Sequence, residues 1–172
     1  MRFAAERLAS GRDGGRLPVV LTVTDVSPLA VRERVRGRAA LAGALHADGR
    51  LVPDLVRWQP AVRPGGRARP AAAVDLAAYR GASPDPLAAD EADLLLALAA
   101  APGLVAGLAG LLPACVVVDP ERPPVPVRLD RDGVVLRVAG AGRSVDARLA
   151  FGVDAVTPVL VWAALEELGT RV

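Results

Sequence analysis

After Asp85 the sequence predicts two short helices, three strands and a closing helix, and this order narrows the fold more than any single motif does. The strands, between residues 125 and 151, alternate apolar and polar side chains, as strands with one buried face do. The helices carry leucines at helical spacing, which predict a buried stripe. We therefore expect a small α/β domain over residues 83–172, in which helices flank a three-stranded antiparallel meander.

The helix ends in this part of the chain carry recognisable signals. Asp85-Pro86 suits the cap and first position of a helix, because aspartate caps helices and proline fits the first turn. The apolar stretch Leu94–Leu112 is interrupted by Pro102-Gly103, so it predicts two packed helices and not a membrane span. Thr157-Pro158 is expected to start the closing helix.

The residues before this boundary alternate as strands do. Leu17–Val26, Val31–Leu45 and Leu51–Val62 are three predicted extended segments. His46-Ala47-Asp48-Gly49 predicts a hairpin turn between the last two, because Asp-Gly tolerates positive φ. Residues 1–82 are therefore expected to form an antiparallel β lobe, which places the whole chain in the α+β class.

The charge pattern argues against nucleic acid and membrane partners. The 21 basic residues are all arginine, the acidic residues number 19, and the two kinds are interspersed, which leaves a net charge of +2. No overall field therefore draws the chain to a polyanion or a membrane surface. Aromatic residues make up only 3% of the chain, which disfavours a nucleic-acid stacking platform. The alanine- and proline-rich, lysine-free composition is typical of a GC-rich genome.

The single cysteine and the N-terminal residues indicate a cytoplasmic protein. Cys115 cannot form an internal disulfide, and its place in the apolar run Ala114–Val118 predicts a buried small hydrophobe. Met1–Arg16 is charged and glycine-rich and lacks the apolar core of a secretory leader.

Four arginines at alternate positions are the strongest candidates for ligand binding. On a strand they would share one face and could hold a phosphate or another anion by bidentate hydrogen bonds. These arginines are Arg32, Arg34, Arg36 and Arg38. The alternative is a solvated face whose arginines pair with acids such as Asp25 or Glu33.

The remaining candidates are one histidine and a few aromatic residues. His46 is the only histidine, which excludes a histidine-based triad or a multi-histidine metal site within one chain. It stays a candidate axial haem ligand, against the alternative of an exposed turn residue. Trp58 could stack on a planar cofactor or fill a core. No nucleotide-binding or nucleophile motif is present, and no catalytic residue is predicted.

Five blocks of the sequence resemble the HugZ-like haem-utilisation family, in its actinobacterial form, and they occur in that family's order. The blocks are Val23–Val31, Arg36–Ala39, Asp85–Leu95, Val127–Val134 and Asp146–Phe151. The resemblance implies a split β-barrel of the FMN-binding type followed by a small α/β domain of unknown function, and it implies a homodimer. It also implies FMN or haem as cofactor.

Two departures from the family bear on function. Members open with a helix and a strand hairpin, and this chain is expected to lack them, which makes the barrel partial. Haem-related members carry Asp-His-Ala-Asp where this chain has Asp90-Glu91-Ala92-Asp93, so a carboxylate, a poor haem ligand, replaces the imidazole.

Three functional hypotheses follow. The first is a non-catalytic or vestigial protein that binds flavin or haem, with Arg34, Arg36, Arg38 and Trp58 as cofactor-binding residues. The second is a flavin-dependent oxidoreductase or haem-degrading enzyme, in which the cofactor supplies the chemistry. The third is a protein-interaction module that uses an open sheet edge. The first is favoured, because the complete cleft and the histidine that the enzyme needs are missing from the sequence pattern.

Overall fold

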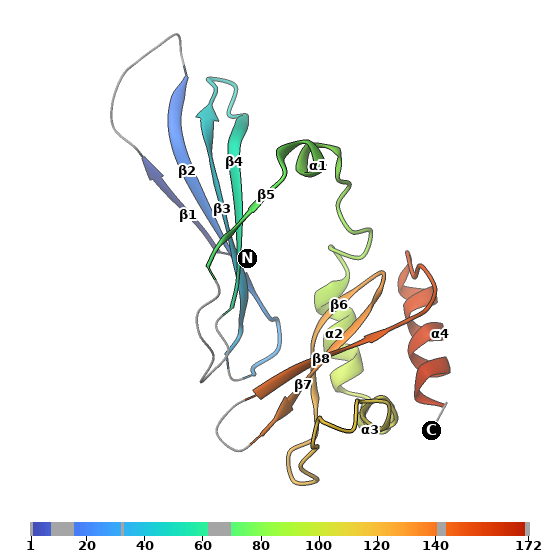
Figure 1. The fold of residues 1–172 in the computed structure, drawn as a ribbon. Helices are drawn as coiled ribbons and strands as arrows, with labels where there is room; N and C mark the ends of the chain where they lie inside the picture. Colours follow the sequence, from blue (N-terminus) through green and yellow to red (C-terminus); the bar gives the residue numbers. More distant parts are fainter. Residues whose placement is uncertain (1, 8–15, 32, 62–69, 141–143, 171–172) are drawn as a thin grey trace. The chain divides into compact units, whose positions relative to one another are not determined.

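The computed structural model of the protein describes the backbone of residues 2–7 and the backbone and side chains of residues 16–31, 33–61, 70–140 and 144–170, and the chain divides into two compact units (Figure 1). Unit 1 holds the N-terminal strands and one short helix. Its elements are β1 (Arg2–Arg7), β2 (Leu17–Val26), β3 (Val35–Leu45), β4 (Leu51–Pro60), β5 (Ala72–Val74) and α1 (Leu76–Gly81). Unit 2 holds the segment Ser27–Arg34 and everything from Pro84 onward. Its elements are α2 (Glu91–Ala99), α3 (Pro102–Gly110), β6 (Val125–Asp130), β7 (Gly133–Ala139), β8 (Ser144–Ala150) and α4 (Pro158–Gly169).

Unit 1 is an antiparallel sheet in which the strands follow their order in the chain, from β1 to β5. The predicted α+β class and the predicted bounds of β2 are confirmed, whereas β1 was not predicted. Within the described residues the sheet is not closed, since β1 and β5 form its two edges. The split barrel therefore stays a prediction.

The turn between β3 and β4 forms as its sequence predicts. The His46 N–H donates to the Arg50 carbonyl at 2.9 Å, and Gly49 has a φ of +82°. The Asp48 carboxylate accepts the Arg50 N–H at 2.9 Å, which closes the tip. In contrast, β3 starts at Val35, four residues later than predicted, because the chain before it turns instead of extending.

Little of unit 1 is buried. Among the side chains described in this unit, those of β2 to α1, Val56 is the only fully buried apolar one, at 4% exposure. The other apolar residues of β2, β3 and β4 are partly exposed on both faces of the sheet, and Leu55 is exposed. Helix α1 buries no residue at all. Unit 1 is therefore a sheet without a closed core.

Unit 2 has the predicted meander and a full core. Its strands follow the order β6-β7-β8, and Leu129, Val134 and Leu149 lie side by side across them. All three are at most 8% exposed, and they pack in one cluster with leucines of α2, α3 and α4. Leu29, from the segment that joins β2 to β3, belongs to the same cluster. This unit is a helix layer on a sheet, as its sequence predicts.

The helix ends differ from the sequence prediction at one place. Asp85 does accept the Leu87 N–H at 2.8 Å, but residues 86–90 form turns and α2 begins only at Glu91. Thr157 caps α4 as predicted, with its hydroxyl accepting the Leu160 N–H at 3.4 Å.

Cys115 is exposed, contrary to the prediction of a buried hydrophobe. The run Ala114–Val118 forms a loop, in which the Val116 N–H donates to the Pro113 carbonyl at 2.8 Å.

No single helix in the described ranges is long and apolar enough to cross a membrane. Helices α2 and α3 reach that length only as a pair, across a 91° bend.

Candidate functional site

The predicted arginine ladder does not form on one sheet face, and Arg36 is the first reason. Its Nε and Nη2 donate to Asp25 Oδ1 at 2.9 and 2.6 Å. The Arg36 side chain is only 10% exposed and that of Asp25 25%. Pairing with a neighbouring acid, the alternative raised by the sequence, therefore holds for Arg36.

A bulge explains why Arg36 reaches Asp25. The register shifts between Asp25, which pairs with Gly37, and Val26, which pairs with Val35, so Arg36 is the extra residue. Such a bulge redirects the side chain of the added residue. Arg36 therefore points to the face of Asp25 and Gly37, whereas a regular strand would have placed it with Arg38.

Arg34 lies before β3, in the segment that belongs to unit 2. Its guanidinium bends back to the Ser27 carbonyl, with Nη2 at 3.1 Å and Nε at 3.3 Å. The Ser27 N–H in turn donates to the Arg34 carbonyl at 2.8 Å. Arg34 thus closes a loop, and Arg32 lies outside the described residues.

Arg38 is exposed and shares its sheet face with a second arginine that the sequence analysis missed. Arg38 pairs with Thr24 on β2 and with Gln59 on β4, and Arg57 pairs with the next residue on that face of β3, Ala40. Diagonal neighbours of this kind lie about 7–8 Å apart. Arg57 is also exposed. Among the side chains described after β1, neither guanidinium has a hydrogen-bond or ion-pair partner.

This face offers an anion several hydrogen-bond donors. We call Thr24, Arg38, Arg57 and Gln59 the arginine face. Two guanidiniums, a hydroxyl and an amide are donors that suit a phosphate or carboxylate, and none of them carries a negative charge that would repel it. The alternation of Arg57 and Gln59 can be seen in the sequence. The β3–β4 register that places them beside Arg38 cannot.

Trp58 lies on the opposite face. It pairs with Ala39, and its ring covers Gly37: a Cβ at Gly37 would come within 2.3 Å of two of the ring's carbons. Its indole thus fills the space above a residue without a side chain. The structure does not bring Trp58 and Arg38 to one surface.

His46 is half-buried at the β3–β4 turn, eight residues from Arg38. At about 3.3 Å per residue along a strand, the two backbones are about 26 Å apart. Within the described ranges no group of three or more histidine, cysteine, aspartate or glutamate side chains could hold a metal ion.

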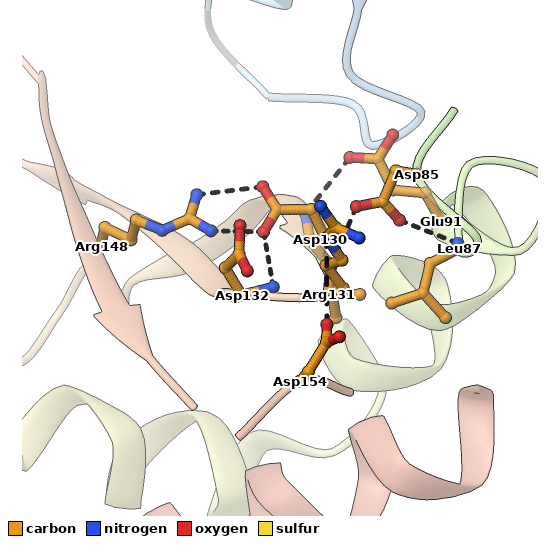
Figure 2. Close-up of polar contacts among 9 residues, drawn as sticks. Asp85, Leu87, Glu91, Asp130, Arg131, Asp132, Arg148 and Asp154 are labelled. Atoms are coloured by element: carbon orange, nitrogen blue, oxygen red, sulfur yellow. Dashed lines mark hydrogen bonds and ion pairs between the residues drawn. The ribbon is translucent and has the colours of Figure 1, made fainter. Parts of the chain in front are cut away.

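Unit 2 contains a polar cluster in which acids bind backbone N–H groups (Figure 2). Asp85 Oδ2 accepts the Arg131 N–H at 3.2 Å, and Glu91 Oε1 accepts the Leu129 N–H at 3.2 Å. Asp130 Oδ1 accepts the Asp132 N–H at 3.1 Å. The Asp85 and Glu91 bonds tie β6 and the β6–β7 turn to the start of α2 and the residues before it (Figure 2), so this cluster is structural.

Two arginines of unit 2 pair with acids across the sheet. Burial alone would raise the pKa of Asp130, but the hydrogen bond and charge of Arg148 hold that pKa below its ordinary value. Arg137 makes a bidentate pair with Asp146, at 2.7 and 2.8 Å, and this bond raises the pKa of the guanidinium. Arg137 Nη1 also donates to the Glu33 carbonyl at 2.7 Å, where Glu33 has a φ of 61°. Both arginines are thus committed to structure.

Comparison with known proteins shows the fold. No protein-family model matches the sequence, and no curated protein matches it. A solved structure of a heme-binding protein from Mycobacterium smegmatis is similar, with a TM-score of 0.58 and 20% identity. The match covers 90% of this chain and 72% of that protein's chain. At this identity the likeness establishes a shared fold, one that a heme-binding protein also adopts.

Proposed function

We propose that this protein is a non-catalytic binding protein for a planar cofactor with an anionic tail, of the haem or flavin class, and that the arginine face holds the tail. The observation that carries the proposal is the pair of exposed guanidiniums, Arg38 and Arg57, without a carboxylate partner among the described residues. Arginine binds phosphate and carboxylate in a bidentate manner. The fold shared with a heme-binding protein, and the resemblance to the HugZ-like family, support the cofactor class.

The side chains around the anion position favour binding over catalysis. Thr24, Arg38, Arg57 and Gln59 are hydrogen-bond donors, and none of them is a histidine, carboxylate, lysine, tyrosine or cysteine of the kind that acts as a general acid or base. His46 lies eight residues from Arg38, near the far end of β3. The proposal therefore gives it no contact with the cofactor. Arg34 and Arg36 are engaged with Ser27 and Asp25, so the proposal depends on Arg38 and Arg57.

We further propose that unit 1 is completed by a second copy of the chain. The support is its burial: an open sheet with Val56 as its only buried apolar side chain among the described residues leaves apolar area for a partner to cover. Sedimentation velocity over a dilution series tests this. We expect a dimer that dissociates on dilution, and a monomer at every concentration would contradict it.

Titration followed by absorbance tests the binding proposal. Hemin, which offers carboxylates, and FMN, which offers a phosphate, are added separately to the full chain. A hydrogen bond to a charged group contributes about 1.5–3 kcal/mol, so the variant Arg38→Ala/Arg57→Ala should bind at least about tenfold more weakly. Arg50→Ala, an exposed arginine at the β3–β4 turn, is the matched control and should bind normally.

The two ligands separate the outcomes. Arginine-dependent binding of hemin assigns a haem-type ligand, and arginine-dependent binding of FMN assigns a flavin-type ligand. Failure of both ligands to bind, or unchanged binding by the double variant, would refute the proposal and leave the interaction module as the better hypothesis.

A further inference from the structure

Unit 2 contains a cavity that is separate from the arginine face. Its volume is about 470 Å³. One side is formed by the end of α2 and by α3, through Ala99, Pro102 and Ala106, and the other by the segment Val118–Pro126, which leads into β6. Cavities of this size hold small organic molecules.

The lining explains why the cavity stays open. Apart from Asp119, every lining residue is alanine, valine or proline. None of these side chains is long enough to fold into the space, and the prolines fix φ in the segment that forms one wall. A ligand would therefore immobilise almost no side-chain rotamers on binding, which lowers the entropic cost.

The same lining defines the ligand. Methyl groups and proline rings offer no hydrogen-bond donor, so a polar ligand would lose its bonds to water without replacement. The one charged residue, Asp119, is an acceptor: its Oδ1 already accepts the Glu121 N–H at 3.0 Å, and its Oδ2 lies 3.9 Å from Arg122 Nε. A carboxylate offers an anion no donor, and no basic side chain lines the cavity to neutralise an anion's charge.

We propose that this cavity is a binding site for an uncharged, apolar small molecule and that it discriminates against anions of the same shape. The site is independent of the arginine face, because its residues all belong to unit 2 and its ligand has the opposite requirement for charge.

Two fluorescent probes with one ring system test the charge preference. N-phenyl-1-naphthylamine is neutral, and 8-anilinonaphthalene-1-sulfonate adds a single sulfonate. Titrated into the full chain, the neutral probe should bind with one site per chain, at least tenfold more tightly than the sulfonate. Asp119→Asn should narrow this gap by strengthening sulfonate binding. Equal affinity of the two probes for the unaltered chain would overturn the proposal.

Filling the cavity tests the location. Ala106→Phe places a ring in the space, and Ala97→Phe places the same ring at an exposed position of α2 that does not line it. The first substitution should weaken neutral-probe binding at least tenfold and the second should leave it unchanged, with circular dichroism checking the fold of both. Unchanged binding by Ala106→Phe, or equal loss in both variants, would overturn the assignment.

A measurement on the unaltered chain keeps the location testable if Ala106→Phe does not fold. With methyl-labelled alanine, the neutral probe should shift the resonances of Ala99, Ala106 and Ala109 and leave that of Ala97 unchanged. Shifts confined to alanines of β3 would place the probe on unit 1 and refute the site.

Discussion

The two units of this protein differ in how completely they bury apolar side chains. Unit 2 packs helices on one face of a three-stranded sheet and, within the described residues, holds every buried apolar side chain except Val56. Its arginines at 137 and 148 pair with acids across the strands. Unit 1 is an open sheet that leaves Arg38 and Arg57 exposed. We expect the packed core of unit 2 to contribute most of the stability, and the anion site that we propose lies on the open sheet of unit 1.

The largest effect should come from the core of unit 2. Leu95 is fully buried in that core, and Leu95→Ala should lower the free energy of unfolding by about 2–5 kcal/mol. Val56→Ala in unit 1 should cost less, because it removes fewer buried atoms from a sheet with little cover. Urea denaturation followed by circular dichroism measures both. Equal losses would show that the two units do not differ in this way.

A substitution in unit 1 should give an intermediate effect. Gly37→Ala places a methyl group against the Trp58 ring and should cost about 1–3 kcal/mol, as overpacking does. In a Trp58→Ala chain, Gly37→Ala should cost less than it does in the unaltered chain, because the colliding ring is gone. Gly103→Ala, at a helical position where the added Cβ meets nothing within 4 Å, is the control and should stabilise by up to about 1 kcal/mol.

Denaturation midpoints of Gly37→Ala, Trp58→Ala, the double variant and Gly103→Ala measure these effects. A destabilisation by Gly37→Ala that Trp58→Ala does not relieve would contradict the packing of the indole over Gly37.

The smallest effect should be the pH dependence of the pair in unit 2. Because Arg148 lowers the pKa of Asp130 below its ordinary value of 3.8, the folded state favours the charged carboxylate. The pair therefore contributes stability above that pH, and the contribution is lost as the pH falls through the lower, folded pKa. Since both side chains are partly exposed, the contribution should stay below about 1 kcal/mol.

Urea midpoints between about pH 6 and 3 measure this contribution. Asp130→Asn should be less stable than the unaltered chain at pH 6 and should approach it as the pH falls. Parallel curves for the two proteins would show that the Arg148 pair adds nothing to folding.

Local signals in the sequence predicted much of the fold. The bounds of β2, the Asp48-Gly49 turn and the Thr157 cap were predicted because each depends on residues close together in the chain. The late start of α2 was not predicted. Asp85 accepts the Leu87 N–H, as a helix cap would, but the residues that follow it, 86–90, form turns.

The candidate site depended on contacts between strands and was predicted only in part. Alternation placed Arg36 and Arg38 on one face, but the bulge beside Val26 turned Arg36 to Asp25. Arg57 was missed because its nearness to Arg38 follows from the pairing of β3 with β4. Neither the β2–β3 register nor the β3–β4 register can be predicted from the sequence of one strand alone.

Hydrogen exchange of the full chain, with and without the cofactor that binds in the titration, tests the central claim most directly. Without ligand, amides of α2, β7 and α4 should exchange more slowly than those of β3 and β4, because a packed core protects them. With ligand, β3 and β4 should gain protection around Arg38 and Arg57, and unit 2 should stay unchanged. Protection gained only in unit 2 would contradict the account.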